Sequence, residues 1–151
     1  MPRQALLKTI ATTILSQPYT GVLRVAIDGV DGAGKTTFAD ELAAVLSPSG
    51  RPIIRASVDS FHNPRAMRYR LGKTSPHGFF NDSYNYDLLK TTLLDPLSPG
   101  GTQHYKRAAF DHATDSTVTS PEEHATPHSI LLFDGIFLHR HILRQYWDFS
   151  I

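Results

Sequence analysis

The feature that most constrains this chain is a glycine-rich run that matches the pattern G-x-x-x-x-G-K-T, from Gly29 to Thr36. Glycines allow the backbone to wrap tightly, so that successive N–H groups can point at one anion. In this pattern Lys35 reaches the β- and γ-phosphates of a nucleotide, and the Thr36 hydroxyl can hold Mg²⁺. We therefore predict a phosphate-binding loop. The residues expected to bind the nucleotide are Gly29, Asp31, Gly32, Ala33, Gly34, Lys35, Thr36 and Thr37.

The sequence on either side of the loop fits this interpretation. A β-branched apolar run at 22–27 predicts a strand before the loop, and apolar spacing within 35–46 predicts a helix that begins there. Its positive N-terminal end would point at the phosphates. A glycine-rich turn without a ligand is the alternative, but such a turn would not require Lys35 and Thr36 at these positions.

Composition and length narrow the class of protein. The 151 residues, 40% hydrophobic and 19% charged, suit one globular domain. A formal net charge of +1 gives no reason to expect nucleic acid or a membrane as partner. The N-terminal segment is amphipathic rather than a continuous apolar signal sequence, so we expect a cytoplasmic location. The absence of cysteine excludes disulfides and thiolate chemistry.

Periodicity predicts most of the remaining elements. We expect a helix at 3–16, within an N-terminal segment of 1–19 that precedes a nucleotide-binding core of 20–151. Further strands are expected at 52–58, at 130–133 and from Phe149. Helices are expected at 139–146 and from Asp87, as N-cap, to Asp95-Pro96. The less regular segments predict a short helix with long loops at 60–86, two short strands about a turn near 112–115, and a polar loop at 121–127.

The alternation of strands and helices predicts an α/β fold of the P-loop NTPase type in one domain over 1–151. Its parallel sheet would be sandwiched by helices. In such sheets ligands bind at the carboxyl ends of the strands. Three acids follow predicted strand ends and are expected at that edge: Asp28, Asp59 and Asp134.

These three acids admit different roles. Asp134 follows four apolar residues, as does the acid that helps to hold Mg²⁺ in P-loop proteins, and the alternative is a turn residue in Asp-Gly. Asp59 could take a proton from a substrate hydroxyl, or it could be a helix N-cap in Asp-Ser. Asp28 is expected to shape the beginning of the loop.

Three segments together resemble the uridine kinase family: residues 27–37, Val58-Asp59-Ser60-Phe61-His62 and residues 132–137. The sequence is similar also to the wider group that includes phosphoribulokinase, pantothenate kinase and nicotinamide riboside kinase. The resemblance covers roughly residue 20 to residue 151. It implies ATP and Mg²⁺ as cofactors and a small-molecule substrate with a hydroxyl that accepts phosphate.

The resemblance also implies roles outside the loop. Asp59 would be the base for a ribose 5′-hydroxyl. Asp82 would contact the ribose, although Asn81 fits an ungapped match equally well. In the segment that resembles the family's base-binding region, an aromatic ring would stack on the pyrimidine and a histidine would bond to its edge. The residues implied there are Tyr105, Phe110 and His112.

The sequence departs from the family pattern in two respects. The acid after the fourth strand is often Glu in the family, and here it is Asp134. The family's lid, with arginines that clamp the transferring phosphate, follows the strand that begins here at Phe149. We therefore expect a core that is incomplete at the C-terminus, either a fragment or a short natural product. Such a chain would transfer phosphate poorly, because arginine charge there contributes ~10³–10⁵ in rate.

The combined expectation is an ATP- and Mg²⁺-dependent kinase. Lys35 and the loop amides would stabilise charge, Thr36 and Asp134 would hold the metal, and Asp59 would be the base. Uridine or cytidine is the favoured acceptor; nicotinamide riboside, pantothenate and ribulose phosphate are alternatives. A nucleotide-binding protein without kinase turnover is the alternative from another class. The eight histidines match no zinc pattern, and homo-oligomerisation is left open.

Overall fold

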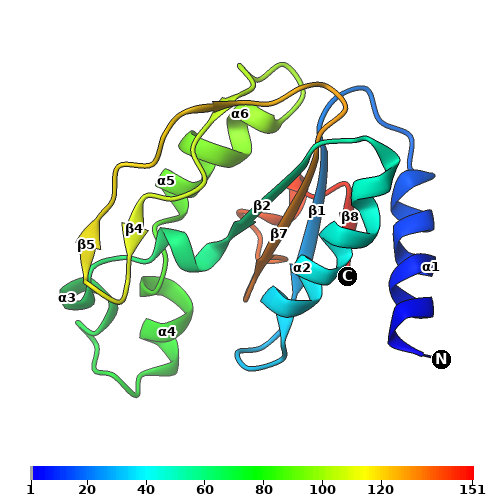
Figure 1. Cartoon of the computed structure of the whole chain (residues 1–151). Coiled ribbons are helices and arrows are strands. Elements are labelled where there is room, and N and C mark those ends of the chain that lie inside the picture. Colours follow the sequence, from blue (N-terminus) through cyan, green and yellow to red (C-terminus); the bar gives the residue numbers. More distant parts are fainter. Residues whose placement is uncertain (1) are drawn as a thin grey trace. The chain divides into compact units, whose positions relative to one another are not determined.

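The computed structural model describes residues 2–151 and divides into two compact units (Figure 1). The first unit runs to Arg55 and resumes at Ala125–Ile151, and the second is Ala56–His124. Among the described residues, no helix has the length and apolar character needed to cross a membrane. The organisation of 1–151 as one domain stays a prediction.

The first unit contains a four-stranded sheet and two long helices. Its elements in chain order are α1 (Arg3–Leu15), β1 (Leu23–Asp28), α2 (Lys35–Leu46), the 3-10 turn η1 (Ser47–Ser49), β2 (Ile53–Ser57), β7 (Ile130–Gly135), the 3-10 turn η4 (Arg144–Tyr146) and β8 (Phe149–Ser150). The last two residues of β2 begin the second unit. The strand order is β2-β7-β1-β8, and β1 pairs in parallel with both β7 and β8. This parallel sheet flanked by helices confirms the predicted α/β fold.

One apolar cluster joins α1, α2 and the sheet. Its buried members are Leu7, Ala11 and Ile14 of α1, Leu23, Val25 and Ile27 of β1, Ala39, Leu42 and Leu46 of α2, and Ile130 and Leu132 of β7. Alternate residues of a strand share one face, and residues three or four apart share one side of a helix. The helices predicted at 3–16 and 35–46 are confirmed, and their buried residues have the spacing on which the prediction rested. Figure 1 shows α1 and α2 on the same side of the sheet.

The second unit is built from short elements. In chain order these are η2 (Val58–Phe61), α3 (Arg65–Arg68), α4 (Pro76–Asp82), α5 (Tyr86–Leu89), the π-helical turn η3 (Lys90–Leu94), α6 (Asp95–Leu97), β3 (His104–Tyr105), β4 (Phe110–Asp111), β5 (Ser116–Thr117) and β6 (Glu123–His124). The predicted pair of short strands about a turn near 112–115 is confirmed, because β4 and β5 pair antiparallel. The segment predicted as a polar loop contains β6, which pairs antiparallel with β3.

The helical segment at 86–97 corrects two predictions. Asp87 was expected to cap it, but the cap is Asn85, whose Oδ1 accepts a hydrogen bond from Leu88 N at 3.0 Å. The helix was expected to end at Asp95-Pro96, but helical structure continues to Leu97. Pro96 has no N–H to donate, and Thr92 O, four residues earlier, accepts a hydrogen bond from Lys106 N at 3.0 Å instead.

The helix predicted at 139–146 is also wrong. Only the short turn η4 forms there. Phe137, just before this segment, has a φ of 61°, which a residue other than glycine seldom adopts and which interrupts regular helix. Trp147 then donates its indole N–H back to Leu138 O at 2.7 Å. The segment is therefore fixed by turns and side-chain contacts rather than by a helical ladder.

Candidate active site

The glycine-rich run forms a loop between the end of β1 and the start of α2. Gly32 and Gly34 have φ values of 78° and 83°, so their backbone conformation favours glycine. Gly34 is also the N-cap residue of α2. The Lys35 ammonium donates a hydrogen bond to Val30 O at 2.8 Å and so folds back over the loop. The loop thus presents backbone N–H groups and one cation at the positive end of a 12-residue helix.

The beginning of the loop is tied to two other segments of the first unit. Asp28 accepts a hydrogen bond from Gly29 N at 2.8 Å, and its role in shaping the loop stays a prediction. Its other carboxylate oxygen lies 2.8 Å from Nδ1 of His139. The Nε2 atom of the same ring lies 2.8 Å from Ser150 Oγ on β8. His139 therefore connects the segment after β7 with both β1 and β8.

An open cavity of about 420 Å³ lies beside the loop in the first unit. Its lining includes Asp28, Gly34, Lys35, Thr37, Phe38 and Arg3. Small-molecule sites in proteins typically have volumes of about 300–1,000 Å³ and combine apolar walls with a few polar groups. Of the residues expected to bind the nucleotide, Ala33, Gly34, Lys35 and Thr37 line this cavity.

Thr36 and Asp134 lie together at the start of α2 and the end of β7. The Thr36 hydroxyl donates to Asp134 Oδ2 at 2.9 Å. Asp134 is 1% exposed, and the Arg55 guanidinium forms an ion pair with its other oxygen, Oδ1, at 3.0 Å. The pair offers a hydroxyl and a carboxylate, and both are oxygen ligands of the kind that Mg²⁺ binds. The metal-binding role of these residues stays a prediction.

Asp59 belongs to the second unit and lies in the short turn η2, after β2. Ser57 caps this turn, because its hydroxyl accepts a hydrogen bond from Asp59 N at 3.2 Å. The alternative in which Asp59 itself is the N-cap is therefore wrong. The Asp59 residue is exposed, and its backbone oxygen lies 2.8 Å from Nδ1 of His62. An exposed carboxylate on a short, capped turn suits a proton acceptor, and the role of base stays a prediction.

Asp82 is buried at the end of α4 and is bound by an arginine. Its two carboxylate oxygens accept hydrogen bonds from Arg70 at 3.0 and 2.8 Å. The hydrogen bonds from Arg70 hold the pKa of the Asp82 carboxyl below its ordinary value. The neighbouring Asn81 is exposed and donates its amide to His77 O at 2.9 Å. Of the two residues considered for the ribose contact, Asn81 is therefore the more accessible.

The residues expected to bind a base lie on the short strands of the second unit or beside them. Tyr105 on β3 and Phe110 on β4 are buried, and burial raises the pKa of the Tyr105 phenol. His112 is exposed in the turn after β4 and packs against the ring of His62, with ring centroids 4.5 Å apart. The ring of Tyr84 lies on His62 as well, at 4.7 Å. The accessible aromatic surface in this part of the unit comes from His112 rather than from Tyr105 or Phe110.

Three residues with notable contacts were not predicted from the sequence: Arg55, His62 and His139. Arg55 gave one signal, a charged residue inside a predicted apolar strand. His62 is the last residue of the segment that resembles the kinase pattern, but the pattern assigns no role to it. His139 gave no usable signal, because its partner Asp28 is 111 residues away in sequence. The partners of Arg55 and His139 are distant in the sequence, as are the rings of Tyr84 and His112 that pack on His62.

The geometry of the first unit defines a class of protein. A parallel sheet carries the G-x-x-x-x-G-K-T loop between β1 and α2, and an acid at the end of the neighbouring β7 contacts the loop's threonine. These features together are those of P-loop nucleotide-binding proteins.

Comparison with known proteins gives the family. The pattern of the Phosphoribulokinase / Uridine kinase family matches residues 24–151, and the chain belongs to this family. A possible uridine kinase from Bacillus stearothermophilus superposes with a TM-score of 0.85 at 24% identity. That match covers 99% of this chain and 80% of the other. A candidate fructose transport system kinase from Silicibacter sp. TM1040 gives 0.69 at 25% identity, over 95% and 72% of the two chains.

The structure of the YGR205w protein is similar with a TM-score of 0.56 at 17% identity, over 89% of this chain and 50% of that one. No protein of curated function matches the sequence. Membership of the family indicates a kinase that phosphorylates a small-molecule alcohol with ATP. It also confirms the predicted family.

Proposed function

We propose that this protein transfers the γ-phosphoryl group of ATP to the 5′-hydroxyl of a pyrimidine riboside, uridine or cytidine. The observation that carries the proposal is the contact of the loop's Thr36 with Asp134, at 2.9 Å, in a chain whose family match covers residues 24–151. The loop supplies phosphate contacts and the two oxygens supply metal ligands, as phosphoryl transfer needs.

The transfer would proceed as an in-line displacement. A lone pair of the acceptor oxygen forms a bond to the γ-phosphorus, the bond to the β,γ-bridging oxygen breaks, and ADP leaves with that electron pair. Asp59 takes the proton of the acceptor hydroxyl. Lys35 and the loop N–H groups stabilise the charge that develops on the phosphoryl oxygens.

Thr36 and Asp134 would hold Mg²⁺, which supplies positive charge at the β- and γ-phosphates. Mg²⁺ is commonly bound by one or two protein oxygens together with substrate phosphates and water. Within residues 2–151 no group of three or more His, Cys, Asp or Glu side chains could hold a metal ion. A pair of protein ligands completed by the nucleotide therefore fits this chain better than a site made by protein alone.

The acceptor assignment rests on similarity and on the second unit. One of the similar solved structures is described as a possible uridine kinase. The exposed ring of His112, which packs on His62, suits a planar base, and the accessible Asn81 suits a ribose hydroxyl. Because both oxygens of Asp82 accept from Arg70, we assign that ribose contact to Asn81 in preference to Asp82.

A test of the acceptor uses the purified chain with Mg²⁺ and γ-labelled ATP. Uridine, cytidine, nicotinamide riboside, pantothenate, ribulose 5-phosphate and fructose are offered separately, and products are resolved by chromatography. We expect label in uridine or cytidine monophosphate. Label in another acceptor would mean that the substrate is different but that the reaction is still phosphoryl transfer from ATP. Tight ATP binding with no labelled product from any acceptor would favour a nucleotide-binding protein without turnover.

A further inference from the structure

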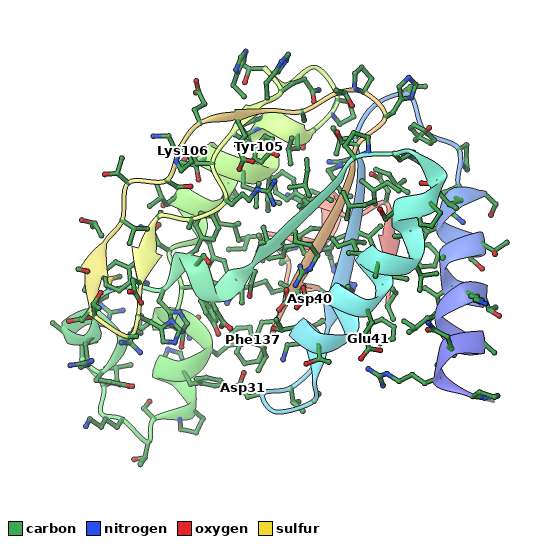
Figure 2. The ribbon with its side chains drawn as sticks, viewed as in Figure 1. Asp31, Asp40, Glu41, Tyr105, Lys106 and Phe137 are labelled. Atoms are coloured by element: carbon green, nitrogen blue, oxygen red, sulfur yellow. The ribbon has the colours of Figure 1, made fainter. Side chains whose placement is uncertain are left out.

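Arg55 lies on β2 and joins three elements of the first unit. Its guanidinium donates from Nη2 to Asp134 Oδ1 at 3.0 Å, from Nη1 to Leu132 O at 2.8 Å, and from Nε to Asp40 Oδ1 at 3.0 Å. Leu132 and Asp134 belong to β7, and Asp40 belongs to α2, where Figure 2 labels it. One side chain thus links two neighbouring strands to the helix that starts at the phosphate loop.

These contacts fix the orientation of the Asp134 carboxylate. Arg55 binds Oδ1 and Thr36 donates to Oδ2, so that each oxygen has a different neighbour. The side chain of Asp134 is 2% exposed and that of Arg55 is 20% exposed. A planar guanidinium with several donors in fixed directions sets the plane of a carboxylate in a way that a lysine cannot.

We propose that Arg55 is a positioning residue for the metal of the bound nucleotide. By holding Oδ1, it keeps Oδ2 of Asp134 on the side of Thr36, where the metal would share both oxygens. Asp40 in turn holds the guanidinium from α2. This role rests on the proposed function, since it requires a metal–nucleotide complex at the loop. Partners that orient a metal ligand without touching the metal typically change metal affinity 10–100-fold when removed.

A merely structural role would have a different signature. A buried carboxylate that loses its partner destabilises the fold as a whole, and every binding property would then weaken together. The positioning role predicts instead a loss confined to the metal-dependent part of nucleotide binding. Contacts of ATP with the loop amides and Lys35 do not pass through Arg55, so ATP binding without metal should be unaffected.

The test is ATP binding by calorimetry, in EDTA and across a Mg²⁺ titration, with thermal unfolding of each variant. Arg55→Met is compared with wild type and with Arg51→Met. Arg51 is a matched control because it lies close in sequence but bonds to His128 O and stacks on Tyr19. For Arg55→Met we expect ATP affinity in EDTA within about twofold of wild type, and a half-saturating Mg²⁺ concentration raised at least about tenfold. Arg51→Met should leave both values unchanged.

Two further variants keep the proposal falsifiable if Arg55→Met does not fold. Arg55→Lys retains the positive charge but not the planar guanidinium with its several donors. Asp40→Asn weakens only the contact between Arg55 and α2. We expect each to raise the half-saturating Mg²⁺ concentration, with the larger rise for Arg55→Lys. Equal losses with and without metal, or no change in the Mg²⁺ titration, would overturn the positioning role alone. If wild type itself binds ATP without any effect of Mg²⁺, the proposed function and this role both fail.

Discussion

The two units of the molecule differ in the length of their helices and strands. The first has helices of 13 and 12 residues and two six-residue strands, and an apolar cluster from four elements joins them. The second has helices of three to seven residues and paired strands of two residues. It also buries apolar side chains, among them Phe61, Leu89 and Leu97, but carries them on these short elements. Long periodic elements build the first unit, and short elements joined by turns build the second.

The residues of the proposed reaction are divided between the two units as well. The phosphate loop sits at a strand–helix junction in the regular unit, where its geometry follows from the sheet. Asp59, His112 and Asn81 sit on turns and short elements of the other unit. We expect changes in the first unit to affect ATP handling and overall stability, and changes in the second, apart from the proposed base Asp59, to have smaller and more local effects.

Among the changes to the first unit, Lys35→Ala has the largest expected effect. Lys35 supplies the only side-chain cation of the loop's G-x-x-x-x-G-K-T run. Removing a group that stabilises charge in the transition state typically lowers the turnover rate by about 10²–10³-fold. The measurement is the labelled-ATP assay with the best acceptor, and Lys8→Ala on the exposed side of α1 is the control. Turnover unchanged by Lys35→Ala would remove the loop from the mechanism.

The next effect is on the apolar cluster of the first unit. Leu42 is fully buried on α2, and Leu42→Ala is expected to lower the free energy of unfolding by about 2–5 kcal/mol, through lost burial and the cavity left behind. Leu15→Ala, at a residue that is 39% exposed, should change it by no more than about 0.5 kcal/mol. Urea denaturation followed by circular dichroism measures both. Similar losses for the two variants would show that the cluster is not what stabilises this unit.

A smaller effect is expected at the cap of α5 in the second unit. Asn85→Ala removes a side chain that accepts from Leu88 N, which typically costs about 1 kcal/mol of stability. Asp87→Ala is the matched control, because the Asp87 side chain is 97% exposed and caps nothing, so its change should stay within about 0.5 kcal/mol. Denaturant titration of both variants measures these changes in the free energy of unfolding. A larger loss for Asp87→Ala would restore the cap predicted from the sequence.

The smallest effect concerns the pH dependence of stability at His62. Burial lowers the pKa of His62 below 6.5, His112 and Arg68 lower it further, and Asp59 opposes them. The unfolded chain therefore binds more protons than the folded one between the lowered pKa and about 6.5, so stability falls as the pH drops through this window. We expect His62→Gln to make unfolding free energy less dependent on pH between about 7 and 5. An unchanged slope would mean that His62 is not desolvated.

The sequence predicted the long elements of the first unit well because their information is local and repeated. The apolar residues of 35–46 return at helical spacing, and those of 130–133 form one continuous run, so neighbours along the chain suffice. The segment at 139–146 failed because its conformation depends on the positive φ of Phe137 and on the contacts of His139 with Asp28 and Ser150. None of these is visible in the spacing of apolar residues.

The candidate site divides in the same way. The phosphate loop could be predicted because its residues are consecutive. Asp134 could be predicted because it ends an apolar strand. Arg55 could not be assigned a role, because its partner Asp134 is 79 residues away and the contact depends on β2 lying beside β7. The ion pair of Asp82 with Arg70 could not be predicted either, because nothing in the sequence indicates which arginine pairs with which acid.

The central claim is that the loop binds ATP and that Asp59 takes the proton of the acceptor hydroxyl. Single-turnover transfer from γ-labelled ATP, with Asp59→Asn compared to wild type at saturating ATP and acceptor, tests it most directly. We predict unchanged ATP affinity and a transfer rate about 10²–10⁴-fold lower in Asp59→Asn, the usual contribution of general base catalysis. Transfer at the wild-type rate in Asp59→Asn would contradict the account.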